Sequence, residues 1–234
     1  MTNSPYPDLN LYDMPNRYRD ISARPKNRAL TERRLIDAVG GVIRTKGYKN
    51  LGVNAVAKEA DVNKKLIYRY FGTFDKLVEA YILENDYWMN VSRKMDTVIE
   101  CKSDPQEMKE VIVSLLEGQF AYFLQHQPMQ DIILWEITEH EKLLNSISNV
   151  REIIGQVIFE KMDTVFKDTD INLRAISALL VSGIYYMILH AKKNESTICE
   201  INVSSEAGQQ EILKAVRLII NWAFERTARE GNKD

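Results

Sequence analysis

Apolar residues recur every three or four positions along most of the chain after residue 30, the spacing of one face of an α-helix. No alternation typical of a β-strand continues for more than four residues. The pattern predicts helices at about 30–46, 53–60, 63–70, 73–97, 105–125, 129–145, 148–167, 171–192 and 206–229. The predicted fold is therefore all-α.

Residues 1–28 lack this apolar period and contain prolines at 5, 7, 15 and 25 together with several basic residues. We expect this segment to be a flexible basic arm. Whether it clamps DNA through Arg24, Lys26 and Arg28, or is only a solvated tail, stays open at this stage.

The longest nearly apolar run, residues 178–191, has 14 positions. A bilayer needs about 20, so we expect a helix buried on most sides and no membrane partner. The content of 45% hydrophobic and 27% charged residues is that of a soluble globular protein. Residues 1–28 have no apolar core of a signal peptide, and Cys101 and Cys199 lie far apart, which favours reduced thiols and the cytoplasm.

Charge is unevenly distributed along the chain. Residues 1–72 hold 14 Lys and Arg against 7 Asp and Glu, whereas residues 73–234 hold 17 against 26. A basic first third suggests contact with a polyanion, joined to an acidic body that does not make that contact. Chance segregation of solvated charges would give the same asymmetry, so the charge needs support from a motif.

The short helix predicted at 63–70 separates its residues into two faces when it is drawn with 100° per residue. Val62, Leu66, Ile67 and Tyr70 share an apolar stripe. The opposite face carries Lys64, Lys65 and Tyr68, with Arg69 at its edge, and the helix contains no acid. Such a face suits phosphate and base contacts, although a solvated basic face remains the alternative.

A tight turn separates this helix from the preceding one, as in a helix-turn-helix that sets one helix into the major groove. The turn needs a residue that tolerates a positive φ, and Asp61 stands there. Thr73 precedes the next helix, where its hydroxyl suits an N-cap.

The segment "GYKNLGVNAVAKEADVNKKLIYRYFGTFDKL", residues 47–77, resembles the N-terminal domain of the TetR family of bacterial transcriptional regulators. The resemblance extends over roughly residues 30 to 80 and is carried by an aromatic after a glycine, the turn and an aromatic box, in order: Gly47-Tyr48, Val56-Ala57, Ala60-Asp61-Val62-Asn63, Ile67-Tyr68-Arg69-Tyr70-Phe71 and Asp75-Lys76-Leu77. It implies a helix-turn-helix at about 52–71 within a DNA-binding domain at 29–76, and a helical ligand-binding and dimerisation domain at 77–234.

By this resemblance, the residues expected at DNA are Gly52, Asn54, Asn63, Lys64, Lys65, Tyr68, Arg69, Tyr70 and Lys76. Four positions depart from the family pattern, among them Asp61 in place of the turn glycine and Lys65 in place of a small residue. Gly52 replaces a hydroxyl residue that caps the second helix, and Phe74 replaces a lysine that contacts the backbone.

The resemblance also implies a homodimer formed through the last two helices, about 171–192 and 206–229, with a small-molecule pocket in the same domain. Ser177, Ala178, Ser182 and Gly183 are small enough to permit close helix approach. Aromatic side chains suggest a ligand that is apolar or aromatic, although such side chains usually only pack in a core. The candidate pocket residues are Trp88, Tyr122, His126, Trp135, Glu136, Tyr185 and Tyr186, with His190 as a further polar anchor.

The expected function is a repressor that binds a palindromic operator and is released by a ligand. An activator, or a regulator controlled by a partner protein, has the same sequence features. A helical-bundle enzyme of the di-iron type needs Glu-x-x-His, but Phe123, Ile137 and Met187 stand three positions before the histidines. We therefore expect no catalysis, no metal and no cofactor.

Overall fold

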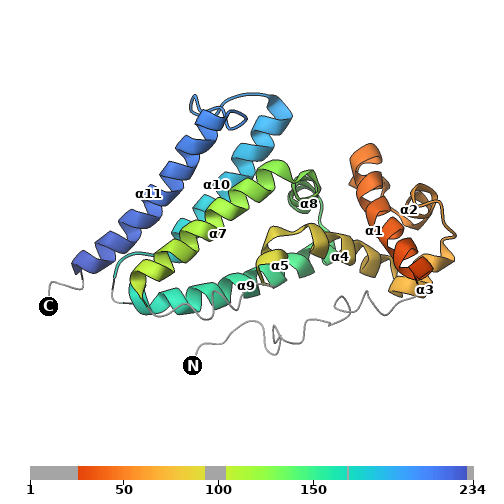
Figure 1. The fold of residues 1–234 in the computed structure, drawn as a ribbon, viewed down its shortest axis with the longest axis horizontal. Coiled ribbons are helices and arrows are strands. Elements are labelled where there is room, and N and C mark those ends of the chain that lie inside the picture. The colour runs from red at the N-terminus through yellow and green to blue at the C-terminus, as the bar shows by residue number, and fades with distance from the viewer. Residues whose placement is uncertain (1–25, 93–103, 168, 231–234) are drawn as a thin grey trace. The chain divides into compact units, whose positions relative to one another are not determined.

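The computed structural model describes residues 26–92, 104–167 and 169–230, and Figure 1 shows their helices. Within those ranges the chain is helical, with one isolated bridge between Ile198 and Ile201 and no strand. The all-α prediction is confirmed. Two compact units meet in sequence between Leu77 and Val78, and each is described by itself.

The N-terminal unit contains α1 (Lys26–Lys46), a 3-10 turn (Tyr48–Asn50), α2 (Val53–Glu59), α3 (Lys65–Phe71) and the first turn of α4 (Phe74–Asn85). Its core joins apolar side chains of α1, α2 and α3, among them Leu35, Val39, Val42, Val56 and Ile67, which are fully buried. Gly47 and Gly72 end α1 and α3 with φ of +76° and +83°, which glycine adopts without steric cost.

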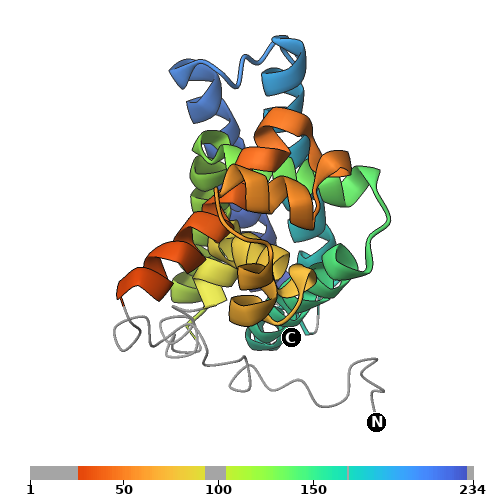
Figure 2. The ribbon, with the colours of Figure 1, turned by 90° about the vertical axis from the view of Figure 1, so that its right-hand side faces the viewer.

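The C-terminal unit contains the rest of α4, then α5 (Tyr87–Ser92), α7 (Pro105–Gln125), α8 (Gln127–Thr138), α9 (Lys142–Phe166), α10 (Leu173–Asn194) and α11 (Glu206–Glu230). Helix α7 is central, because it packs against α5, α8, α10 and α11. Figure 2 shows α10 and α11 joined at one end. Side-chain caps begin α7 and α10, where Asp104 accepts from the amide of Glu107 and Asn172 from that of Ala175.

Several predicted helix boundaries are wrong, and α9 begins at Lys142 instead of near residue 148. The helix expected to run from Thr73 past Trp88 ends at Asn85, because the carboxylate of Asp86 accepts from the amides of Trp88 and Met89 and starts α5. Its expected end near Thr97 lies outside the described residues. The helix expected at 129–145 ends at Thr138, where residues 139–141 take extended conformations before α9 begins.

Helix α10 is less buried than its apolar sequence predicts. Among the described residues it is the one helix that is long and apolar enough to cross a membrane. Only 22% of its most apolar 18-residue stretch is buried. One such helix is weak evidence for a membrane. The prediction of a helix buried on most sides is wrong, since Leu179 and Tyr186 are 76% and 63% exposed. Ser177, expected to favour helix approach, instead lies buried inside the unit.

Candidate functional site

The turn between α2 and α3 is fixed by one unusual backbone conformation and by a side chain of α1. Asp61 has φ of +50°, as the sequence predicts for this position. Arg34 of α1 donates to the carbonyl of Ala60 at 2.6 Å and lies 3.6 Å from the Asp61 carboxylate. Because this arginine holds the turn, α3 is oriented relative to both preceding helices.

Helix α3 separates its two faces as predicted. Ile67 is fully buried, and Leu66 and Tyr70 are half-buried. On the opposite face Lys64, Lys65, Tyr68 and Arg69 are exposed. Tyr68 is 52% exposed, although an aromatic ring gains free energy by burial. An exposed aromatic among cations, without an acid on the helix, forms a surface suited to a polyanion.

Two asparagines border this exposed face. The side chain of Asn63 accepts from the amide of Lys65 at 2.9 Å and so caps the start of α3. The Nζ of Lys64 donates to the side chain of Asn54 on α2 at 3.3 Å, which brings outward positions of the two helices together. Gly52 begins α2 in extended backbone and offers no side-chain cap.

The predicted DNA residues outside α2 and α3 differ in their exposure and in their contacts with the protein. Lys76 is exposed in the first turn of α4, and its amide donates to the Thr73 hydroxyl at 3.1 Å, the predicted cap. Arg28 lies over the ring of Tyr70 at 5.1 Å and donates to Glu32 at 3.0 Å. Arg24 and the side chain of Lys26 lie outside the described residues.

Residues 35–81 match the family model described as bacterial regulatory proteins, tetR family. These residues form a TetR-type N-terminal domain. The family is non-enzymatic, and its N-terminal domain implies DNA binding.

A solved structure from Clostridium perfringens, described as a candidate fatty acid metabolism regulator, shares the fold with a TM-score of 0.57 and 14% sequence identity. The alignment covers 80% of this chain and 96% of that one. A search of curated proteins finds no match. The likeness to the solved structure therefore shows a shared fold and carries no information on a ligand.

In the C-terminal unit, polar contacts converge on the junction between α4 and α5. The carbonyl of Asn85 accepts from the Tyr122 hydroxyl at 3.1 Å, and its side chain lies 3.0 Å from the Nε2 of His126. The rings of Tyr122 and His126 pack with centroids 4.5 Å apart. Helix α7 thus holds the last residue of α4 through two neighbouring side chains.

The side chain of the next residue, Asp86, is fully buried. One carboxylate oxygen caps α5, and the other pairs with Arg151 of α9 at 2.6 and 2.7 Å. Arg151 also pairs with Glu136 of α8, which accepts a hydrogen bond from Ser148. Burial alone would lower the pKa of Arg151, but the charges of Asp86 and Glu136 raise it, so the guanidinium stays charged.

Two aromatic residues complete the junction. The Tyr87 hydroxyl donates to the carbonyl of Leu115 at 2.8 Å, passing so close to Gly118 that a Cβ there would lie 2.5 Å from the oxygen. The indole of Trp88 donates to the Tyr185 hydroxyl of α10 at 3.0 Å. Burial raises the pKa of both Tyr87 and Tyr185 to about 12. Both phenols are therefore neutral at pH 7.

We name the four residues Asn85 to Trp88, with the side chains that hold them, the junction cluster. Five predicted pocket residues belong to it: Trp88, Tyr122, His126, Glu136 and Tyr185. Trp135 is buried on α8. Tyr186 lies apart, exposed and packed against His190 with ring centroids 5.7 Å apart. The prediction that Tyr186 lines the same pocket as these residues is therefore wrong, because Tyr186 does not contact the junction cluster.

The predicted site residues did not include Asn85, Asp86 or Arg151. Arg151 had a detectable signal, because it occupies a position in the apolar stripe of α9, four residues after Ile147 and three before Ile154. A charge at such a position is expected to have a buried partner. Asp86 had no comparable signal.

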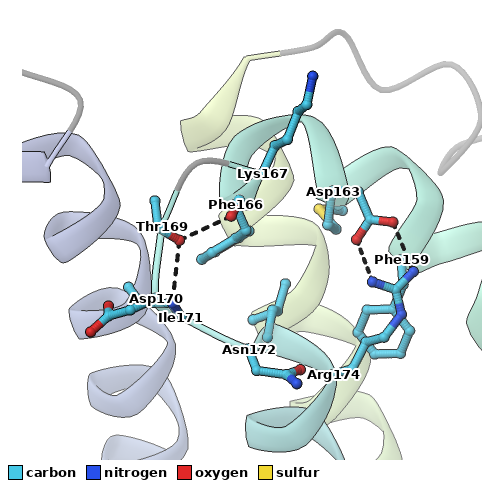
Figure 3. Close-up of a pocket in the computed structure, with 11 residues that line it drawn as sticks. Phe159, Asp163, Phe166, Lys167, Thr169, Asp170, Ile171, Asn172 and Arg174 are labelled. Atoms are coloured by element: carbon cyan, nitrogen blue, oxygen red, sulfur yellow. Dashed lines mark hydrogen bonds and ion pairs between the residues drawn. The ribbon is translucent and has the colours of Figure 1, made fainter.

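A cavity with a volume of about 440 Å³ lies where α9 turns into α10 (Figure 3). Phe159, Phe166 and Leu173 line it, together with the ion pair of Asp163 and Arg174. None of the predicted pocket residues borders this cavity. Its main polar side chains are engaged with the protein: Thr169 bonds the Phe166 carbonyl and Asn172 caps α10.

Proposed function

We propose that this TetR-family regulator is a homodimeric repressor that binds a palindromic operator through α3 and is released by a small molecule. We place it in the cytoplasm, without a membrane partner. The observation that carries the proposal is the exposed basic and aromatic face of α3. The Tyr68 side chain is 52% exposed, so the ring is available to a duplex.

On this proposal, α3 enters the major groove with Lys64 and Lys65 toward the DNA. Lysine ammonium groups bind phosphates, and the Tyr68 hydroxyl and ring suit a base edge or a thymine methyl. The start of α2 supports a further phosphate contact, since Gly52 leaves its first amides without a side-chain cap. The bond from Lys64 to Asn54 then exchanges for contacts to the duplex.

The outer surface of α10 supports dimerisation. Ala175, Ala178, Leu179, Ser182 and Tyr186 recur at helical spacing and are exposed. The opposite side of the helix, with Ile184 and Ile188, is buried. A Cβ on Gly183 would meet nothing within 4 Å, so there is room for a second backbone to approach.

Helix α11 has a similar exposed stripe, formed by Ala215, Leu218 and Trp222, while Val216, Ile220 and Ala223 are buried. Exposed apolar residues on two neighbouring elements of a soluble protein mark an interaction surface. A second copy is the partner that a two-half-site operator requires, because half-sites lie about 34 Å apart.

We place ligand action at the junction cluster, which joins side chains of α7, α8, α9 and α10 to the end of α4. A ligand that separates Trp88 from Tyr185 would release α5 from α10. Such a ligand shifts operator binding only as far as it favours one state over the other.

The test of DNA binding starts from a pool of random duplexes, from which the full-length protein selects binding sequences. We expect a two-fold symmetric sequence to be enriched, and a gel shift to give specific binding that weakens steeply with salt. Tyr68→Ala removes the base contact while leaving the core intact. Recovery of unselected sequence by the wild type would overturn the proposal.

The dimer is tested by Leu179→Glu in sedimentation experiments. A charge at the centre of the α10 stripe is expected to convert the dimer to a monomer, because its burial is costly without a partner. The matched control is Ile137→Glu, at a residue that is 68% exposed on α8 and outside both stripes. A wild type that sediments as a monomer at micromolar concentration would refute this part.

A further inference from the structure

The turn that leads into α3 has a backbone conformation that its residue adopts less readily than glycine does. Asp61 has φ of +50°, and its side chain is 98% exposed, so packing of that side chain does not hold the turn. The amide of Asp61 donates to the carbonyl of Lys58 at 3.2 Å. The amide of Val62 donates to the carbonyl of Ala57 at 3.0 Å. This pair of bonds is the usual end of a helix whose left-handed residue is glycine.

A side chain of α1 adds a contact that the two backbone bonds do not supply. Neither bond uses the carbonyl of Ala60, the C-cap of α2, and Arg34 donates to that carbonyl at 2.6 Å. The same guanidinium nitrogen lies 3.4 Å from the carbonyl oxygen of Asp61 and 3.6 Å from its carboxylate. A cation at the C-terminal end of a helix also interacts favourably with the helix dipole. Arg34 therefore contacts the end of α2 and the turn at once.

Helix α3 depends on this turn for its direction. The helix has seven residues, and Ile67 is the one among them that is fully buried. Three residues separate Asp61 from Lys65, where α3 begins. Because a short helix with one buried anchor can rotate about that anchor, the backbone conformation of Asp61 determines where Lys65 and Tyr68 point.

We propose that Arg34 is a positioning residue for operator binding: it holds Asp61 in the left-handed conformation and so directs the exposed face of α3. Arg34 itself touches no DNA. This inference rests on the proposed function, and it adds a determinant of operator affinity that lies outside both helices of the helix-turn-helix. An aspartate at the turn makes the arginine necessary, whereas a glycine there would adopt the conformation without it.

The experiment is a double-mutant cycle in the full-length protein. Arg34→Met keeps the apolar part of the side chain and loses the donor, and it is made both in the wild type and in Asp61→Gly. The matched control is Arg33→Met, at the neighbouring arginine of α1, which pairs with Asp37 of the same helix. For each protein, affinity for the selected operator is measured at several salt concentrations, together with the thermal midpoint.

We expect Arg34→Met to weaken operator binding about tenfold in the wild-type background, as when a base contact is weakened in each subunit. In the Asp61→Gly background the same change should weaken binding about threefold or less, because glycine adopts the turn without steric cost. Arg33→Met should bind as the wild type does.

The salt dependence separates positioning from direct contact, since the Arg34 side chain is 46% exposed and a phosphate contact is the competing role. On our proposal, the slope of log K against log salt is the same for Arg34→Met and the wild type. A slope that falls by about 2 for the dimer would overturn the inference and assign a phosphate contact to Arg34.

Wild-type affinity of Arg34→Met would also overturn the inference. Equal losses in the two backgrounds would do so too, since Arg34 would then act independently of the turn. If Arg34→Met does not fold, Arg34→Lys, which keeps the charge but loses the guanidinium, is measured by the same criteria. A wild type that selects no sequence contradicts the proposed function itself, so the two failures are distinguishable.

Discussion

The two units place their polar side chains in opposite ways. In the N-terminal unit Lys65, Tyr68 and Arg69 point to solvent from a helix of seven residues. In the C-terminal unit Asp86, Arg151 and Tyr185 turn inward and bond to one another or to neighbours. The first arrangement leaves polar groups available to a partner, and the second uses them to fix helix ends.

This difference has an energetic consequence. Exposed cations cost the fold little when they are removed, whereas a buried charge that loses its partner is destabilising. Mutations on the exposed face of α3 should therefore weaken DNA binding with little change in the free energy of unfolding. Mutations of equal size at the junction cluster should change both quantities.

The largest effect is expected for Arg151→Met, which leaves the fully buried Asp86 without its cation. We expect a loss of about 3–5 kcal/mol in the free energy of unfolding. Urea denaturation measures it. Arg174→Met, at an ion pair that is half exposed, should lose about 1 kcal/mol or less. Similar losses for the two variants would contradict the contrast between buried and exposed pairs.

In the N-terminal unit, Ile67→Ala should cost about 2–5 kcal/mol, because the side chain is fully buried. Its neighbour Tyr68→Ala should change stability by about 0.5 kcal/mol or less, while operator binding weakens by about 1–3 kcal/mol. Thermal melts and gel shifts measure the two quantities. The reverse pattern would mean that α3 faces the other way.

Gly118→Ala tests the packing of Tyr87 across α7. The new methyl group would lie 2.5 Å from the Tyr87 oxygen, and we expect a cost of about 1–3 kcal/mol from overpacking. Tyr87→Phe removes that oxygen and its bond to Leu115, so the double variant should lose less than the two single losses added together. Additive losses would show that the contact is not the cause.

The smallest effect concerns His126. Burial lowers its pKa below the ordinary 6.5, so the folded state takes up the proton less readily than the unfolded chain. Its contribution to stability is present above pH 6.5 and is lost as the pH falls through the lowered pKa. Between pH 7 and pH 5, His126→Gln should lose less stability than the wild type. His140→Gln, at an exposed histidine, should behave as the wild type does.

Much of the N-terminal unit could be predicted from the sequence, because its determinants are local. The turn residue Asp61, the glycines that end α1 and α3 and the Thr73 cap each act within a few positions. The two faces of α3 follow from the helical repeat alone. What the sequence does not contain is the role of Arg34, which reaches the turn from a distant position in α1.

The C-terminal unit was predictable in its helices and much less so in its site. The spacing of apolar residues locates α7 and α11 well, but Arg151, the ion-pair partner of Asp86, lies 65 positions away along the chain. Asp86, which caps α5, is the one local signal near the end of α4, since neither Gly nor Pro is present there. Tyr185 and Tyr186 are adjacent in sequence, yet Tyr185 is half-buried at the junction cluster and Tyr186 is exposed.

The salt dependence of operator affinity is the most direct test of whether the exposed face of α3 contacts DNA. For wild type and Lys65→Gln, the binding constant on the selected operator is measured from low to physiological salt. If Lys65 contacts a phosphate in each subunit, the slope of log K against log salt falls by roughly 0.9 per contact, so by about 2 for a dimer. An unchanged slope and affinity would contradict the claim that the exposed face of α3 contacts DNA.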